Sequence, residues 1–433
     1  MKSSGPRAGR APSATLPLAY LVSSAVAFVV AAGGLPWLSP ELAGHFYHPR
    51  VLALTHTVTL GWIMMSLLGA SYQLIPIVLE RPLWSERLAR WQLGVLLVGV
   101  TGMVAHFWIG TWPALVGAAA LVGLGAGMHL VNVAVSLHGF DRWTFTARLV
   151  VLGHVGLSLT VLFGVALALN HLWSFLPGEL FPRLHAHVHL ALAWWIAPML
   201  MGVSARVYPM FLLAPEPRGW PGGLQLWGLA VGAPVLVAGL LAMPALITPG
   251  ALALAAATIG HLCWVVQMAR SRKRPRLDWG LRFTLTAAGF LPLGTALGLA
   301  LAFDLVSGSR AALAYIVLLL GGWVSLSIVG MMLKIVPFLV WYRVYSPKAG
   351  RAQVPTLAEL SWPAAEATAW ALLTSGILSL AGAVAAGSAA WIAASGAVTT
   401  LGALAFAAAL GRVLLHHVQP APGQAPRAEA PAR

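Results

Sequence analysis

The chain has 433 residues, of which 59% are hydrophobic and only 9% are charged, and its formal net charge is +15. This balance excludes a soluble globular domain and predicts an all-α polytopic membrane protein. The single cysteine, Cys263, excludes disulfide frameworks, thiolate zinc sites, iron–sulfur clusters and covalent c-type haem attachment. Any redox centre must therefore be held by His, Met or Tyr.

Apolar runs long enough to cross about 30 Å of hydrocarbon predict twelve membrane-spanning helices. Numbered in chain order as spans 1 to 12, they lie near residues 14–36, 51–79, 88–109, 112–138, 146–172, 185–213, 223–245, 248–270, 281–304, 309–341, 361–385 and 388–415. The predicted organisation is a cytoplasmic N-terminal segment at 1–13, one membrane domain at 14–417 and a disordered cytoplasmic tail at 418–433. Span 1 is too long for a cleaved signal peptide, so we interpret it as a retained signal anchor.

Charge distribution predicts the topology. Of the 26 Lys and Arg residues, 21 lie in the terminal segments and the even-numbered connections, whereas three, Arg50, Arg183 and Arg310, lie on the opposite side. The positive-inside rule therefore predicts an inner-membrane protein with both termini in the cytoplasm. The basic run at 270–276 (RSRKRPR) falls between spans 8 and 9, where anionic lipid headgroups are a better partner than nucleic acid.

An internal repeat, Trp-x6-Gly-x6-Pro, occurs once in each of spans 2, 6 and 10. Its three copies are Trp62/Gly69/Pro76, Trp195/Gly202/Pro209 and Trp323/Gly330/Pro337. The spacing predicts three pseudo-symmetric four-helix arcs in which 51–79, 185–213 and 309–341 are equivalent. On a regular α-helix, the residue six before the Trp lies roughly 120° away from the Trp stripe. That residue is His56, His189 or Val317, so the histidines are not part of the packing repeat.

Fourteen histidines accompany only eleven carboxylates, and imidazole suits haem iron and copper. Eight histidines are predicted at the outer side or in the outer third of the membrane: His45, His48, His56, His106, His171, His185, His187 and His189. An intramembrane ionisable group is costly without a role, which makes His56 a candidate ligand rather than a core histidine.

The densest cluster is His185, His187 and His189 in the sequence HAHVH, at the predicted start of span 6. On a regular helix His187 points away from the other two, so a three-histidine metal site requires a non-helical start. Interfacial histidines bonded to water are the alternative interpretation.

Other ionisable residues have simpler interpretations. Arg206 and Lys334 share one repeat position and are expected to extend towards the cytoplasmic face. The histidines expected to serve packing or hydrogen bonding are His106, His129, His154 and His261. Only Glu366 is a carboxylate within the predicted bilayer, which disfavours an ion-coupled carrier.

The segments HPRVLALTHTVTLGWIMMSLLGASYQLIPIVL and LHAHVHLALAWWIAPMLMGVSARVYPMF, set in twelve helices and three arcs, resemble subunit I of the heme-copper oxidases, which include the nitric oxide reductases. In outline the chain is also similar to the NnrS haem and copper proteins of the nitrosative-stress response. The resemblance implies that His56 binds a b-type haem and that His189 or His187 binds copper. It also implies a cytochrome or another respiratory subunit as a partner.

The chain departs from this family at two places. Span 10 contains no histidine, where the family has a His-x-His pair, and span 7 lacks the paired copper histidines. We therefore expect a haem-binding, copper-binding inner-membrane protein in respiratory electron transfer or nitric-oxide-related chemistry, an oxidoreductase if it is an enzyme. The expected cofactor ligands are His56 and His189, and the metal ligands are His185, His187 and His189. The alternatives are a cofactor-free transporter or channel, or an assembly scaffold.

Overall fold

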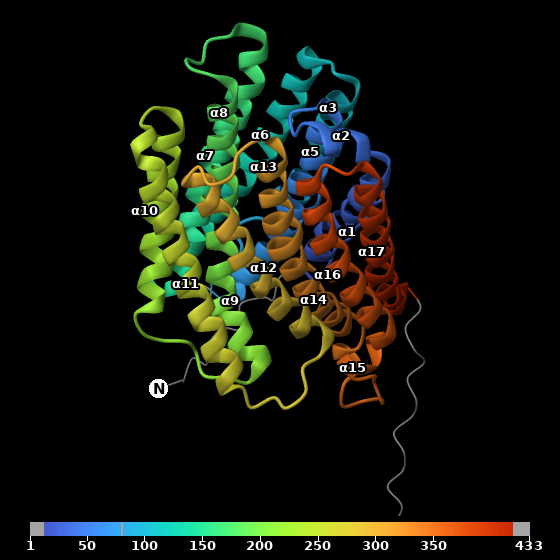
Figure 1. The fold of residues 1–433 in the computed structure, drawn as a ribbon. Helices are drawn as coiled ribbons and strands as arrows, with labels where there is room; N and C mark the ends of the chain where they lie inside the picture. Colours follow the sequence, from blue (N-terminus) through green and yellow to red (C-terminus); the bar gives the residue numbers. More distant parts are fainter. Residues whose placement is uncertain (1–12, 79–80, 419–433) are drawn as a thin grey trace, which may run out of the picture.

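The computed structural model describes residues 13–78 and 81–418. Within these residues twelve helices are long and apolar enough to cross a membrane, so the protein is an all-α polytopic membrane protein, as predicted. Figure 1 shows a single bundle, and helix α1 (Thr15–Trp37) begins at the same end of it at which helix α17 (Ala389–Val418) ends. The tail expected at 418–433 and the segment at 1–13 lie almost wholly outside the described residues.

The spans follow the predicted bounds closely, and the largest difference is at span 6, which begins at Leu180. Arc 1 contains spans 1 to 4. Span 1 is α1 (Thr15–Trp37), span 3 is α5 (Glu86–Ile109) and span 4 is α6 (Trp112–Ser136). Span 2 is formed by α3 (Pro49–His56), η1 (Thr57–Met64) and α4 (Met65–Val78). Arc 2 contains α7 (Phe145–Trp173), span 6 formed by α8, η2 and α9 (Leu180–His189, Leu190–Ile196, Ala197–Leu212), α10 (Pro221–Leu241) and α11 (Ile247–Ser271), which follows η3 (Pro244–Leu246). Arc 3 contains α12 (Trp279–Ala302), span 10 formed by α13, η4 and α14 (Ser309–Ile316, Val317–Ser325, Leu326–Val344), α16 (Pro363–Ala386) and α17 (Ala389–Val418). The connections carry α2 (Ser39–Gly44), η5 (Ser346–Lys348) and α15 (Leu357–Leu360).

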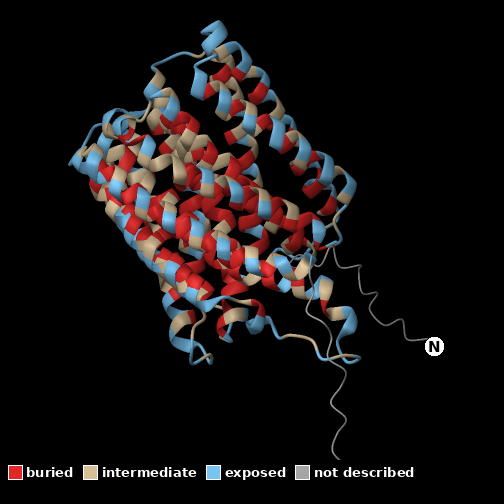
Figure 2. Cartoon of the chain, turned by 90° about the vertical axis from the view of Figure 1, so that its right-hand side faces the viewer, coloured by how far each residue is buried: buried red, intermediate tan, exposed pale blue. Residues whose placement is uncertain are grey.

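The contacts between helices repeat from arc to arc. The first and second spans of each arc pack together, as do the third and fourth, and the fourth span packs on the first span of the next arc. Span 12 packs on span 1 in the same way, which closes the ring. Spans 2, 6 and 10 are the inner helices, because 67%, 67% and 72% of their most apolar windows are buried, against at most 44% elsewhere. The burial view in Figure 2 shows these buried residues running through the middle of the bundle.

Each inner helix packs through the glycine of the repeat. A Cβ at this glycine would approach the first span of the same arc to 2.7 Å or less. The contacts are Gly69 with Tyr20 Cβ at 2.6 Å, Gly202 with Leu149 Cβ at 2.7 Å and Gly330 with the Gly280 carbonyl oxygen at 2.5 Å. Small residues of this kind let two membrane helices approach closely enough for extensive van der Waals contact. The sequence repeat therefore encodes one packing contact, between the inner helix and the first span, that occurs once in each arc.

The structure corrects one expectation about these helices. Each inner span changes to a π-helix directly after the position of His56, His189 or Ile316, and the repeat Trp lies within that π segment. The rotation of 120° expected for a regular α-helix therefore does not apply between histidine and Trp. A π turn is wider than an α turn, and such segments are rare and concentrate at functional sites. Trp62 Nε1 donates to Ser325 Oγ at 3.0 Å, which joins two π segments at the centre of the bundle.

Two basic residues lie within the inner helices, Arg206 and Lys334, and both pair with carboxylates. These pairs lie at the end of the bundle that carries the 270–276 loop, which we call the basic end. Lys334 Nζ lies 2.6 Å from an Asp278 carboxylate oxygen, and Arg206 pairs with Glu216. The opposite end, with the loop at 45–48, is hereafter the histidine end. As expected, neither cation turns towards the histidines.

Adding one methyl group at the repeat glycines should destabilise the bundle. We expect Gly69→Ala, Gly202→Ala and Gly330→Ala each to cost about 1–3 kcal/mol, because the helices must separate or the neighbouring side chain must shift. Thermal unfolding in detergent measures this. The control is Gly94→Ala, where a Cβ meets nothing within 4 Å and helix propensity favours alanine. Equal midpoints for all four variants would contradict the packing role.

Candidate functional site

A cavity of about 910 Å³ occupies the histidine end of the bundle, between the inner helices and the spans around them. Apolar side chains form most of its wall, and Trp195 and Trp323 of the repeat line it. Of the eight histidines predicted for this side, the structure brings six together around the cavity: His45, His56, His171, His185, His187 and His189. Asp304 is the only carboxylate among the described residues of the wall.

The other two predicted histidines serve local structure. His48 caps α3, because its Nδ1 accepts from the Arg50 backbone N–H at 3.3 Å. The His106 imidazole contacts the Thr111 hydroxyl, with Nδ1 and Oγ1 2.8 Å apart. Neither residue lines the cavity, so six of the eight histidines predicted for this side lie around it and two do not.

His56 and His189 adopt the same conformation at equivalent positions of arcs 1 and 2. In each, Nδ1 donates to the backbone carbonyl four residues earlier, Leu52 or His185, at 2.8 Å. A carbonyl oxygen only accepts, so the proton sits on Nδ1 and the Nε2 lone pair is left for a ligand. A ligating histidine in proteins is commonly oriented in this way by a carbonyl acceptor. The His56 ring also stacks on Phe107, with centroids 4.6 Å apart.

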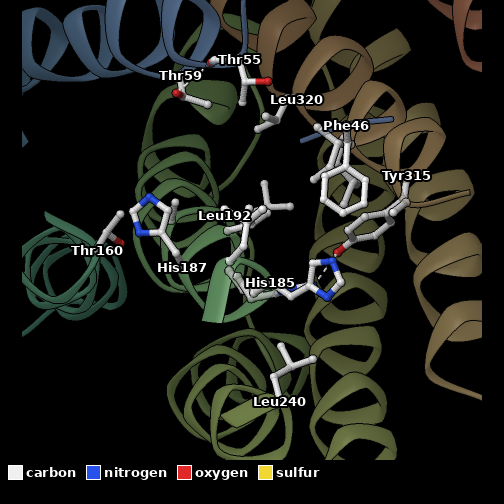
Figure 3. Close-up of a pocket in the computed structure, with 18 of the residues that line it drawn as sticks. Phe46, Thr55, Thr59, Thr160, His185, His187, Leu192, Leu240, Tyr315 and Leu320 are labelled. Atoms are coloured by element: carbon white, nitrogen blue, oxygen red, sulfur yellow. Dashed lines mark hydrogen bonds between the residues drawn. The ribbon is translucent and has the colours of Figure 1, made fainter. Parts of the chain in front are cut away.

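The HAHVH cluster does not form one site. Helix α8 is regular from Leu180 to His189, so the non-helical start that a three-histidine site requires is absent. His187 turns towards α7, where Figure 3 shows it beside Thr160, whereas Tyr315 and Phe46 lie on the other side of the cavity. Across residues 13–78 and 81–418, no group of three or more His, Cys, Asp or Glu side chains is placed to hold one metal ion.

The side chain eight residues before the repeat Trp is seated over a glycine in every arc. A Cβ on that glycine would lie 3.7 Å or less from it. The three pairs are Leu54 over Gly34, His187 over Gly164 and Tyr315 over Gly298. In the last two pairs the distance, to an imidazole or phenol ring carbon, is 2.8 Å. Span 10 thus places a tyrosine where span 6 has a histidine.

Two positions of the repeat meet where neighbouring arcs join. The two positions involved are the residue six before the Trp in one arc and the residue eight before the Trp in the next. His56 and His187 line the same cavity from arcs 1 and 2, and His189 Nε2 lies 3.5 Å from the Tyr315 hydroxyl. At the third junction, Val317 and Leu54 pack against the same apolar cluster. Equivalent junctions therefore carry a His/His pair, a His/Tyr pair and an aliphatic pair.

Sequence reasoning missed Tyr315. The signal was present, because Tyr315 precedes Trp323 by eight residues as His187 precedes Trp195. The position six before the Trp, where spans 2 and 6 have histidine, is valine in span 10 and gives no such signal. A comparison of every lining position would have placed a polar group on span 10.

Three further histidines, His129, His154 and His261, do not line the cavity and contact other polar side chains. His129 Nε2 lies 3.2 Å from His154 Nε2, and His129 Nδ1 lies 3.0 Å from the Tyr72 hydroxyl, which donates to Gln92. His261 Nδ1 lies 3.3 Å from Gln225 Oε1. These contacts agree with the expectation that the three histidines serve packing or hydrogen bonding.

At the mouth of the cavity, the Tyr47 hydroxyl lies 3.4 Å from His171 Nε2, and the His171 ring stacks on Trp112 with centroids 4.1 Å apart. Burial raises the pKa of Tyr47, and nearby Arg183 opposes that shift. The phenol is therefore neutral at physiological pH and contributes a hydrogen-bonding group, without charge, at the entrance.

Comparison with protein-family models and with curated protein sequences finds no match to this chain. The site must therefore be interpreted from its own geometry.

The tautomer of the two equivalent histidines is directly testable. We expect His56 and His189 in cofactor-free protein to be neutral with the proton on Nδ1, because each Nδ1 donates to a carbonyl. Nitrogen NMR of histidine-labelled protein distinguishes the tautomers, with assignment from His56→Gln and His189→Gln. A proton on Nε2 of either residue would contradict the geometry.

Proposed function

We propose that this chain is a haem-binding inner-membrane protein in which His56 ligates the iron. The observation that carries the proposal is the His56 imidazole, held by the Leu52 carbonyl and the Phe107 ring with its Nε2 free at a large apolar cavity. Histidine is the common axial ligand of b-type haem, and a non-covalent haem needs no cysteine.

The cavity fits a planar macrocycle better than a bare ion. Its volume of about 910 Å³ lies at the upper end of the range of roughly 300–1,000 Å³ for small-molecule and cofactor sites, and its wall is mostly apolar. No Lys or Arg lines it among the described residues. Haem propionates would extend towards the histidine end, where Arg50 and Arg183 lie.

His187 lines the cavity from the neighbouring arc and has an unpartnered buried Nδ1, so it would be the second residue to hold the haem. Gly164 leaves the space that its ring occupies. His189, which we also expected to bind haem or copper, belongs to the next junction with Tyr315. This assignment divides the HAHVH histidines between two sites.

Haem would supply one-electron redox chemistry in the outer part of the membrane, so we infer a role in electron transfer or nitric-oxide-related chemistry. The residues of this chain would hold the haem, fix the tautomer of its ligand and keep water away from it. Span 10 contains no histidine, whereas the oxidase family has a histidine pair on its tenth helix, so the reaction centre of that family is not proposed. A cytochrome or another respiratory subunit would supply or accept the electron.

Spectroscopy tests the haem assignment. We expect purified protein to show a Soret band and the reduced bands of a b-type haem, and His56→Ala to abolish or strongly weaken them because the iron loses a ligand. His187→Ala should retain haem with an altered, five-coordinate spectrum. The control is His138→Ala, an exposed histidine at the basic end.

Two outcomes would remove the proposal. Haem-free protein from haem-replete cells would favour a transporter or scaffold that uses the cavity for another ligand. An unchanged spectrum in folded His56→Ala would move the ligand elsewhere in the chain.

The orientation that accompanies this proposal has its own test. With 21 basic residues against three, we expect the basic end in the cytoplasm, because Lys and Arg in short loops resist translocation. A reporter fused after Arg433 should be active only as a cytoplasmic reporter, and one inserted after Gly387 only as a periplasmic reporter. The reverse pattern would place the cavity on the cytoplasmic side.

A further inference from the structure

We propose that Tyr315 is a metal ligand, and that with His189 and His185 it forms a copper site at the junction of arcs 2 and 3. This site is separate from the proposed haem site at His56 and His187, and it does not depend on it. It also differs from the metal site expected from the sequence, because a phenol from span 10 replaces His187.

The His189/Tyr315 pair is poorly satisfied as a hydrogen bond. The His189 Nε2 and the Tyr315 hydroxyl are 3.5 Å apart, beyond the 2.7–3.2 Å usual for nitrogen–oxygen hydrogen bonds. Their rings are nearly parallel, with an interplanar angle of 25°. Two ligand atoms each about 2.0–2.2 Å from one ion can be separated by as much as about 4 Å, so both can bind one ion from these positions.

His185 supplies a third donor on the same helix. It precedes His189 by four residues, a spacing that places two imidazoles on one helical face, as in helical metal motifs. Its Nε2 is buried and has no hydrogen-bond partner, and its ring lies against Phe46 with centroids 5.8 Å apart. An unpartnered buried nitrogen of this kind needs an explanation, and a metal ion provides one.

The fold holds the phenol at this point. A Cβ on Gly298 would lie 2.8 Å from Tyr315 Cε2, so the ring fills the space that the glycine leaves on α12. The equivalent seat in arc 2 holds His187, which we assign to haem, and the one in arc 1 holds Leu54, which cannot ligate. The position eight before the repeat Trp thus carries a side chain that can ligate at two junctions and an aliphatic side chain at the third.

Charge favours copper on this set of ligands. Two neutral imidazoles and one phenolate supply two nitrogens and one anionic oxygen, a combination suited to Cu²⁺, which also binds most tightly among the divalent first-row metals. On binding, the Tyr315 O–H bond breaks, a Cu–O bond forms and the proton leaves to water at the cavity mouth. The phenolate offsets one of the two charges, which lowers the cost of placing the ion in an apolar wall.

Copper loading of the full-length protein tests the proposal. Protein purified through a histidine-free affinity tag and stripped with chelator is titrated with Cu²⁺, then examined by metal analysis, electron paramagnetic resonance and visible absorption. We expect about one tightly bound copper with nitrogen coupling and a phenolate-to-copper absorption band. Tyr315→Phe should lose the band and bind copper on the order of tenfold or more weakly, and His189→Ala should lose the site.

The controls separate this site from the haem site and from surface binding. Tyr342→Phe, at an exposed tyrosine of the basic end, should keep both the band and the affinity. His56→Ala should lose haem and keep copper, so failure of one assignment leaves the other measurable. Gly298→Ala should weaken the band because its methyl group displaces the phenol ring while both ligating histidines remain.

Three results would overturn the proposal. One is copper that binds equally to the unmodified chain and to folded Tyr315→Phe with the same spectrum. Another is copper that only the surface histidines hold, removed by His138→Ala. A third is a site that takes Zn²⁺ with higher affinity than Cu²⁺.

Discussion

The close approach of each inner helix to the first span of its arc is the contact on which the rest of the structure depends. Inside a membrane, apolar side chains gain little by leaving lipid for one another, so helices associate through close packing. Gly69, Gly202 and Gly330 permit backbone approach in all three arcs. This contact sets the height and rotation of each inner helix. It thereby places the positions six and eight before the Trp at the junctions between arcs.

The π segments complete this arrangement. Each begins at the level of the candidate ligands and contains the repeat Trp, so the inner helices widen just below the histidine end. Trp62 closes the centre of the bundle through its bond to Ser325, while Trp195 and Trp323 face the cavity. The repeat Trp therefore packs the core in arc 1 and lines the cavity in arcs 2 and 3. All three inner helices therefore change geometry at equivalent positions of the repeat.

Threefold architecture also explains why the polar residues can differ so much between equivalent sites. A packing repeat constrains the Trp and Gly positions, but the junction positions only need to fit over a glycine or beside a neighbouring arc. Histidine, tyrosine and leucine all meet that requirement. The aliphatic junction of Val317 and Leu54 shows that the fold does not need polar groups there. Polar groups at the other two junctions are the ones to which we assign the proposed ligand sites, since unpaired polar atoms in apolar surroundings are costly.

The sequence by itself determined the membrane class, all twelve spans and the threefold repeat, because long apolar runs and fixed spacings are local properties of the chain. It also identified His56 and the HAHVH histidines as the main candidates. It did not determine that α8 stays helical and so divides those histidines, or that His187 lines the cavity with His56 while His189 faces Tyr315. These pairings join residues from different arcs, and they depend on helix rotations that the glycine contacts and the π segments set in three dimensions. Spacing along one chain segment carries no information about such rotations, so only the tertiary structure decided which side chains share a site.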